Sequence, residues 1–145
     1  MYARSPEQVF QWFSDADRKR GWFAENANEE TLSYEFDFRV GGAERTRWEW
    51  QGGGPIPAGT IMGNDTVYMD IVPNRRIVLA YSMLMGDRRF SSSLLTFEFL
   101  AQEGGTRLKA TEQGAFFEQS DGPEMRRSGW GGLFETLADA IDADG

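Results

Sequence analysis

The sequence predicts an α+β fold, in which a curved antiparallel sheet packs around a long C-terminal helix and two short helices lie near the N-terminus. Three observations predict it. The chain opens with helix-start signals, its middle alternates apolar and polar residues, and its end repeats apolar residues at helical spacing. Helices, then strands, then one long helix are typical of α+β layers. A length of 145 residues suits one domain, spanning 1–145.

The N-terminal segment carries the signature of a capped helix. Ser5 is placed to cap it, Pro6 occupies its first position, and Gln8 lies three residues after the cap. The apolar residues that follow at helical spacing are Val9, Phe10 and Phe13. A second short helix is expected over 15–22, ending at or near Gly21.

The middle of the chain alternates with period two, which predicts half-buried strands joined by short glycine-containing turns. The expected strands cover 32–39, 43–51, 67–72, 76–85, 90–100 and 106–113. The first of them is expected to place Leu32, Tyr34, Phe36 and Phe38 on one face. The glycine- and proline-rich stretch at 52–57 is interpreted as a long loop within the domain.

The end of the chain predicts a long amphipathic helix. Its apolar stripe consists of Trp130, Leu133, Phe134, Leu137 and Ile141. The concave face of the sheet is the one large partner available to this stripe. Three glycines at 129, 131 and 132 each cost about 1 kcal/mol relative to alanine. They indicate a close approach to the sheet or to a ligand, or alternatively a frayed or late-starting helix.

Composition excludes several classes of function. The chain has no cysteine and no histidine, which rules out Ser-His-Asp and Cys-His catalysis and ordinary zinc sites. A net charge of −8 argues against nucleic acid or an anionic membrane as a partner. No cofactor is expected. The first residues contain no apolar leader segment, so a cytoplasmic location is expected.

Large aromatic side chains gather on the inward phase of the strands. That phase indicates a greasy cavity facing the helix, or alternatively a filled core. The residues expected to contact a ligand are Glu44, Trp48, Trp50, Tyr81, Met83, Phe99, Glu112, Phe116, Trp130 and Phe134.

Two carboxylates share this inward phase. Glu44 and Glu112 are interpreted as polar anchors for a ligand or as a general base; alternatively, they lie near solvent at strand ends or pair with arginine. The arginine pairs, including Arg126 and Arg127, are interpreted as solvated turns, with an anion clamp as the alternative. Phe116 and Phe117 form either a lid or local core.

Six short motifs resemble one known family when they are taken together and in order. They are SPEQVF at 5–10, FDFRVGG at 36–42, DIVPNRRIV at 70–78, GTRL at 105–108, TEQG at 111–114 and GW at 129–130. They are similar to those of START-like (SRPBCC) domains of the activator of heat-shock-protein-90 ATPase homology type. The resemblance implies a helix-grip fold, often with a cavity between sheet and helix, in a superfamily of small-molecule carriers, cyclases and co-chaperone domains.

The favoured function is a cytoplasmic domain that binds a small apolar or amphipathic molecule between the sheet and the C-terminal helix. This function needs no nucleophile, metal or histidine. A cyclase- or hydrolase-like enzyme using carboxylates and Tyr81 is the alternative, and so is a chaperone-interacting regulatory domain. Whether the protein is an enzyme stays open at this point.

Related domains have a full strand before the opening helix, and here residues 1–4 supply at most a short one. A missing strand leaves unpaired backbone groups on its neighbour. The sequence therefore raises the expectation of a homodimer in which a second copy covers this edge.

Overall fold

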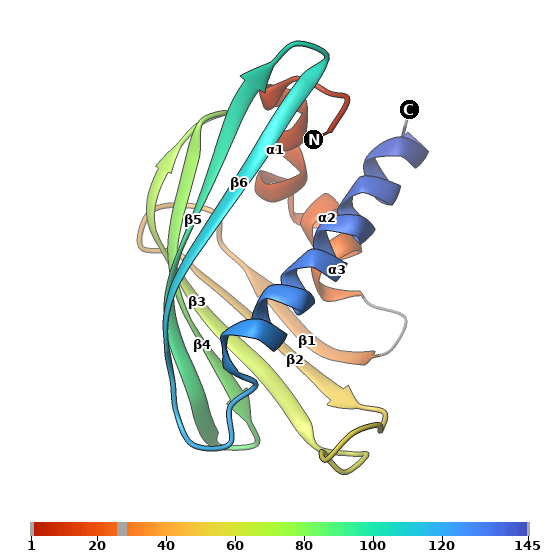
Figure 1. Cartoon of the computed structure of the whole chain (residues 1–145), viewed down its shortest axis with the longest axis vertical. Helices are drawn as coiled ribbons and strands as arrows, with labels where there is room; N and C mark the ends of the chain where they lie inside the picture. The colour runs from red at the N-terminus through yellow and green to blue at the C-terminus, as the bar shows by residue number, and fades with distance from the viewer. Residues whose placement is uncertain (1, 26–28, 145) are drawn as a thin grey trace.

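Within the residues that this computed structural model describes, 2–25 and 29–144, six antiparallel strands form one curved sheet in chain order (Figure 1). The strands are β1 Glu29–Phe36, β2 Ala43–Trp50, β3 Ile61–Val72, β4 Arg76–Met85, β5 Arg88–Gln102 and β6 Gly105–Phe116. Each strand pairs with the next through a short connection or, between β2 and β3, through the long glycine-rich loop. The predicted meander is confirmed.

The helices flank this sheet at both ends of the chain: α1 Pro6–Ser14, α2 Ala16–Lys19, the π-helical turn η1 Arg20–Ala24, and α3 Gly122–Asp144. The capping box of α1 is formed, since the Ser5 hydroxyl accepts from the Gln8 N–H and the Gln8 side chain accepts from the Ser5 N–H. The second helix differs from its prediction. It continues through the π-helical turn to Ala24 and does not end near Gly21.

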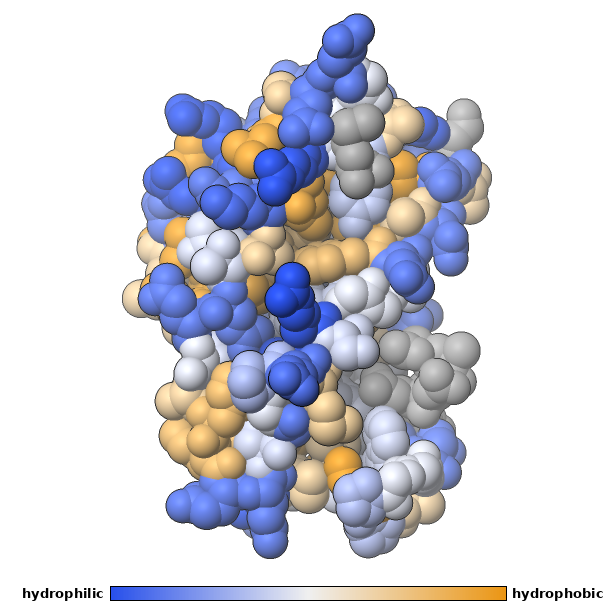
Figure 2. All heavy atoms as spheres, viewed as in Figure 1, coloured by the Kyte–Doolittle hydropathy of each residue, from blue (hydrophilic) through white to orange (hydrophobic). Residues whose placement is uncertain are grey.

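The C-terminal helix α3 crosses the concave face of the sheet, with α1 and α2 beside its upper half (Figure 1). This arrangement confirms the predicted fold class. The same face seen as a surface is mostly hydrophilic, with separate apolar patches between the polar side chains (Figure 2). None of the helices in the described part of the chain is both long and apolar enough to cross a bilayer.

The main core lies in the upper half, where α1 meets β5 and the C-terminal half of α3. Phe13 lies at its centre, with its ring centroid 5.1 Å from those of Trp22, Phe97 and Phe99. Leu137 and Ile141 of α3 are fully buried in the same cluster. Edge-to-face aromatic pairs add about 0.5–1.5 kcal/mol each beyond the burial of apolar area.

Strand β3 begins six residues earlier than predicted, at Ile61 instead of residue 67. The missed half contains Gly63, Asn64 and Asp65, residue types that are depleted in strands. The neighbouring strand compensates for them. The Arg47 guanidinium lies where a side chain at Gly63 would be, donates to the Asn64 carbonyl at 3.1 Å, and pairs with Asp65 at 2.9 Å.

The predicted inward face of β1 is wrong at one residue. A register shift between Thr31 and Ser33 leaves Leu32 51% exposed. Tyr34, Phe36 and Phe38 remain on the inward side, although Phe38 lies beyond the end of the strand. A β-bulge of this kind reverses the alternation on one side of it, so the period-two pattern cannot reveal it.

The glycines of α3 do not mark a close approach to the sheet, so that half of the prediction is wrong; a close approach to a ligand stays a prediction, since Gly129 lines the cavity described below. An added Cβ at Gly129, Gly131 or Gly132 meets nothing within 4 Å. The helix is also not late-starting, because it begins at Gly122.

The outer edge of β6 is only partly covered. Tyr2 pairs with Thr106 through both backbone hydrogen bonds, at 2.8 and 2.9 Å. Leu108, Ala110 and Glu112 direct their backbone groups to the same edge, since alternate residues of a strand point the same way. Among the described residues no strand pairs with them. The expected dimer across this edge stays a prediction, and a monomer at all concentrations in light scattering would contradict it.

Two alanine substitutions distinguish the observed core from the one that sequence alternation alone predicts. Phe13→Ala removes the centre of the aromatic cluster, and we expect a loss of about 3–5 kcal/mol in the free energy of unfolding. Leu32→Ala, at a position that the alternation places inside, is expected to cost no more than about 0.5 kcal/mol. Urea denaturation measures both, and a large loss at Leu32 would show that the bulge is wrong.

Candidate functional site

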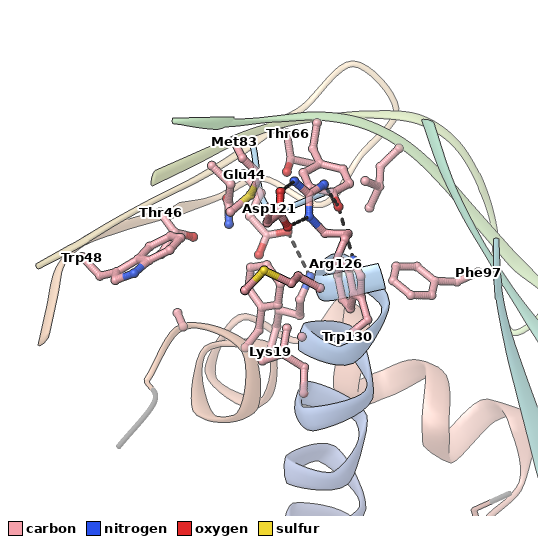
Figure 3. Close-up of a pocket in the computed structure, with 18 residues that line it drawn as sticks. Lys19, Glu44, Thr46, Trp48, Thr66, Met83, Phe97, Asp121, Arg126 and Trp130 are labelled. Atoms are coloured by element: carbon pink, nitrogen blue, oxygen red, sulfur yellow. Dashed lines mark hydrogen bonds and ion pairs between the residues drawn. The ribbon is translucent and has the colours of Figure 1, made fainter. Parts of the chain in front are cut away.

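A cavity of about 290 Å³ lies between the lower half of the sheet and the N-terminal half of α3 (Figure 3). Its floor consists of polar residues on neighbouring strands, namely Thr46 of β2 and Asn64 and Thr66 of β3. Thr46 and Asn64 are direct partners in the sheet register. The volume lies near the lower end of the range of about 300–1,000 Å³ that is usual for small-molecule sites.

The remaining walls of the cavity are mostly apolar. They include Phe23 of η1, Leu79 and Met83 of β4, Phe97 of β5, and Trp130 and Leu133 of α3. The π-helical turn matters here, because it places Trp22 in the core and its neighbours Phe23 and Ala24 at the cavity. Such turns are frequent at functional sites. The cavity thus combines a polar floor with mostly apolar walls.

A buried ion pair closes the β2 side of the cavity. The Lys19 ammonium lies 3.0 Å from Glu44 Oε1, and the two residues are only 3% and 1% exposed. Tyr34 donates to Glu44 Oε2 at 2.6 Å, and the Tyr68 hydroxyl donates to Oε1, the oxygen that Lys19 also contacts. The ammonium also lies 4.4 Å from the centre of the Phe23 ring. Charge pairing and hydrogen bonds together make burial of this carboxylate tolerable.

The tyrosines around these carboxylates resist ionisation. Burial raises the pKa values of Tyr34 and Tyr68, and the negative charge of Glu44 raises them further. Burial likewise raises the pKa of Tyr81, with an added contribution from its hydrogen bond to Glu112. These phenols therefore remain hydrogen-bond donors at neutral pH.

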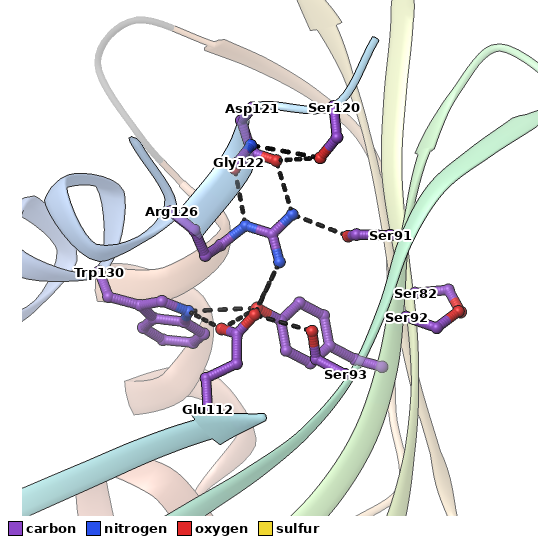
Figure 4. A network of polar contacts seen from close by, with 11 residues as sticks. Ser82, Ser91, Ser92, Ser93, Glu112, Ser120, Asp121, Gly122, Arg126 and Trp130 are labelled. Atoms are coloured by element: carbon purple, nitrogen blue, oxygen red, sulfur yellow. Dashed lines mark hydrogen bonds and ion pairs between the residues drawn. The ribbon is translucent and has the colours of Figure 1, made fainter. Parts of the chain in front are cut away.

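A second network joins α3 to β4, β5 and β6 (Figure 4). Arg126 is buried, and its guanidinium donates to Glu112 at 2.9 Å, to Tyr81 at 3.0 Å and to Ser91 at 2.7 Å. Two further donations, both at 2.8 Å, form a bidentate pair with Asp121. Burial alone would lower the pKa of Arg126, but Asp121, Tyr81 and Glu112 raise it overall.

The carboxylate of Glu112 is fully occupied. Tyr81 and Trp130 donate to one oxygen, and Ser93 and Arg126 donate to the other. A carboxylate offers about four acceptor sites, so none remains for a substrate proton. Glu112 positions the Tyr81 hydroxyl and the Trp130 indole and is poorly placed to act as a general base.

Three buried polar atoms at the cavity have no hydrogen-bond partner among the described residues. They are Thr46 Oγ1, Trp48 Nε1 and Asn64 Oδ1. Their side chains are 2%, 9% and 6% exposed. Buried polar groups in native proteins are nearly always satisfied, so each such atom requires an explanation.

A second, open groove of about 550 Å³ lies on the other flank of α3, against β6. Phe116, Arg127 and Phe134 line it, and Glu112, Arg126 and Trp130 form its inner wall. Phe116 contacts Arg126, with the guanidinium carbon 5.0 Å from its ring centre, whereas Phe117 is exposed. Phe116 is therefore packed as local core, which is one of the two roles considered for this pair, and Phe117 is not.

The structure distributes the ten predicted ligand residues over three places. The cavity brings together Glu44, Trp48, Tyr81, Met83 and Trp130. The groove contains Glu112, Phe116 and Phe134, and Trp130 again. Neither space contains Phe99, which is buried against α1, or Trp50, whose indole donates to the Gly53 carbonyl at 3.2 Å. Glu112 pairs with an arginine, as one interpretation of the two acids expected, whereas Glu44 is buried and pairs with a lysine, which neither interpretation named.

Several cavity residues were missed from the sequence. The favoured interpretation of Arg126 as a solvated residue is wrong, because Arg126 is buried; its neighbour Arg127 is exposed, as expected. Helical spacing from Trp130 gives the available signal, since Arg126 lies four residues before it. Asn64 and Thr66 were missed together with their half of β3. Lys19 offered no signal, because its carboxylate partner is 25 residues away in the sequence.

The family model for Activator of Hsp90 ATPase homolog 1-like protein matches residues 3–142 of this chain. Two solved structures are similar throughout. An uncharacterized protein from Rhizobium leguminosarum has 34% identity and a TM-score of 0.87, covering 98% of this chain and 90% of that one. The Mll3558 protein from Rhizobium loti has 40% identity and a TM-score of 0.83, covering 96% and 90%.

A more distant structure shares the fold alone. The AHSA1-like protein from Aeromonas hydrophila has 19% identity and a TM-score of 0.66, covering 99% of this chain and 88% of that one. Among proteins with a curated description, none is significantly similar to this chain.

The Lys19–Glu44 pair is expected to matter through charge compensation. Lys19→Met leaves the Glu44 carboxylate buried without its counter-charge, so we expect a loss of about 3–5 kcal/mol in the free energy of unfolding. The double variant Lys19→Met with Glu44→Gln removes the buried charge, keeps an oxygen acceptor for one tyrosine and offers an amide donor to the hydroxyl of the other, and is expected to recover most of the loss. Urea denaturation of Lys19→Met, of Glu44→Gln and of the double variant gives a double-mutant cycle, which measures the coupling between the two side chains. Additive losses would contradict the pairing.

Alkaline pH is expected to destabilise the protein from about the ordinary tyrosine pKa of 10 upward. All four tyrosines have raised pKa values, and burial raises that of Tyr2 to about 12. Their contribution is fully present below pH 10 and is lost as the pH rises, because unfolded tyrosines then release protons that folded ones retain. Each contributes a slope of about 1.4 kcal/mol per pH unit.

Near-ultraviolet absorbance of tyrosinate, followed together with circular dichroism, measures this effect. Tyrosinate is expected to appear only as the fold is lost. Ionisation of the tyrosines in the folded protein near pH 10 would contradict the burial described above.

Proposed function

This chain belongs to the Activator of Hsp90 ATPase homolog 1-like family, and on that premise we propose that it binds one small, mostly apolar molecule in the cavity between the sheet and α3. Membership alone does not select a function, because one fold hosts many. The proposal therefore depends on the site. The observation that carries it is a cavity with mostly apolar walls and three polar atoms that have no partner within residues 2–25 and 29–144.

The polar floor argues against a cavity left by imperfect packing. A cavity that stays empty is lined by apolar side chains, whereas one with polar groups holds water or a ligand. Here, polar side chains that already lie inside direct unsatisfied atoms to the same space. An uncompensated polar group costs about 1–3 kcal/mol. A ligand that provides hydrogen bonds together with apolar contact would offset this cost.

Binding is favoured over catalysis by the state of the acidic groups. Glu112 accepts four hydrogen bonds, and Glu44 and Asp121 accept three each, counting those from Lys19 and Arg126. A general base needs a free lone pair within reach of the substrate proton, which Glu112 lacks and which Glu44 and Asp121 retain at one position each. The tyrosines cannot serve as bases either, because their raised pKa values keep them protonated.

A glycine of α3 provides a test that leaves the network untouched. Met125, Gly129 and Leu133 are spaced four apart and all line the cavity. Gly129→Leu therefore fills its margin, and the substitution improves helix propensity by roughly 1 kcal/mol. We expect fluorescence of the neutral dye N-phenyl-1-naphthylamine to report one binding site in the native protein and at least about tenfold weaker binding in this variant, a difference of about 1.4 kcal/mol.

Gly132→Leu is the matched control, since Gly132 lies in the same helix, is equally unobstructed and does not line the cavity. It is expected to bind the dye as the native protein does. Equal binding by both variants, or no binding by the native protein, would overturn the proposal. Native mass spectrometry of protein isolated from its own cells is expected to show a retained small molecule.

A further inference from the structure

The three cavity atoms that have no partner among the described residues belong to neighbouring positions of β2 and β3. Thr46 and Trp48 are alternate residues of β2 and therefore point to the same face. Asn64 is the register partner of Thr46 on β3. Figure 3 shows Thr46 and Trp48 on one side of the cavity, with Arg126 and Trp130 of α3 on the other. One end of the cavity is thus polar and unsatisfied.

The chemistry of these atoms specifies what can satisfy them. The indole N–H of Trp48 is only a donor, and the Asn64 oxygen is only an acceptor. The Thr46 hydroxyl can act as either. A complementary group must therefore present an acceptor and a donor next to each other. An amide has a carbonyl oxygen that accepts and an N–H that donates, side by side. It can therefore pair with the side-chain amide of Asn64 whichever way that amide is turned.

The charges at the cavity disfavour an ionised ligand. Two carboxylates line the cavity, Glu44 and Asp121, and each is paired with a cation, Lys19 or Arg126; Arg126 is also paired with Glu112, which lines the groove. An anion would therefore meet no free counter-ion among the described residues that line the cavity. A cation would meet carboxylate oxygens that are already largely occupied, and an unpaired buried charge costs several kcal/mol.

Resting on the proposed function, we propose that the ligand is an uncharged molecule with a flat apolar body and an amide-like head group. The head group accepts from Trp48 and donates to Asn64, and Thr46 completes the set. The body lies among Phe97, Trp130 and Leu133 at the opposite side. At about 30 Å³ per water, the cavity holds roughly ten waters, which matches a bicyclic aromatic body with a small head group.

Four probes of equal non-hydrogen atom number test the head group. They are naphthalene-2-carboxamide, naphthalene-2-carboxylate, naphthalene-2-carboxamidine and 2-isopropylnaphthalene. Titration calorimetry on the full chain is expected to show the carboxamide binding at least about tenfold more tightly than each of the others, since it alone makes both kinds of hydrogen bond while remaining neutral.

Substitutions locate the preference. Thr46→Val and Asn64→Leu are expected to reduce the ratio of carboxamide to hydrocarbon affinity by about threefold or more each, the effect of one net hydrogen bond. Thr96→Val is the control, because Thr96 lies on the outward phase of β5 and lines no part of the cavity. The indole N–H resonance of Trp48 is expected to move downfield with the carboxamide and not with the hydrocarbon.

The outcomes separate this inference from the proposed function. Equal binding of hydrocarbon and carboxamide, or tightest binding of either ionised probe, overturns the head-group assignment and leaves a cavity binder. The head-group assignment is also overturned if none of the four probes binds while N-phenyl-1-naphthylamine still binds and Gly129→Leu weakens that binding. The proposed function then remains. If the dye does not bind either, both proposals fall.

Discussion

Two carboxylates on the inward face of one sheet impose the constraint on which this structure depends. Glu44 and Glu112 are tolerable there because cations from the helices pair with them and hydroxyl groups from the strands donate to them. Lys19 thereby connects α2 to β2, and Arg126 and Trp130 connect α3 to β4 and β6. These polar contacts position α2 and the N-terminal half of α3 against the sheet.

The two halves of the concave face are consequently different in kind. In the upper half, aromatic rings around Phe13 fill the space between α1, β5 and the end of α3. In the lower half, side chains held by ion pairs and hydrogen bonds surround a space that they do not fill. Networks of this type resist rearrangement, because breaking any one contact leaves a buried group unsatisfied. A persistent cavity beside a rigid core is the result.

The sequence predicts those features that depend on residues close to one another along the chain. It does not predict those that depend on a residue of another element. The capping box at Ser5 and the apolar stripe of α3 depend on residues within a few positions of one another, and both were predicted. The N-terminal half of β3 was missed, because Gly63 and Asn64 are poor strand formers that only Arg47 of the adjacent strand makes acceptable. Asn64 and Thr66, which form part of the polar floor of the cavity, lie in this half of β3. The sequence therefore predicts a candidate site that is more aromatic than the observed one.

The sequence by itself determined the order and type of the elements, the inward phase of most strands and the absence of histidine and cysteine chemistry, since these follow from composition and from spacing along the chain. Only the tertiary structure decided that Lys19 and Arg126 are inside, that Leu32 is outside, and which aromatic residues surround a space instead of filling one. The physical reason is that burial of a charge depends on its partner. That partner is brought close by the fold, across separations in sequence that no local pattern records.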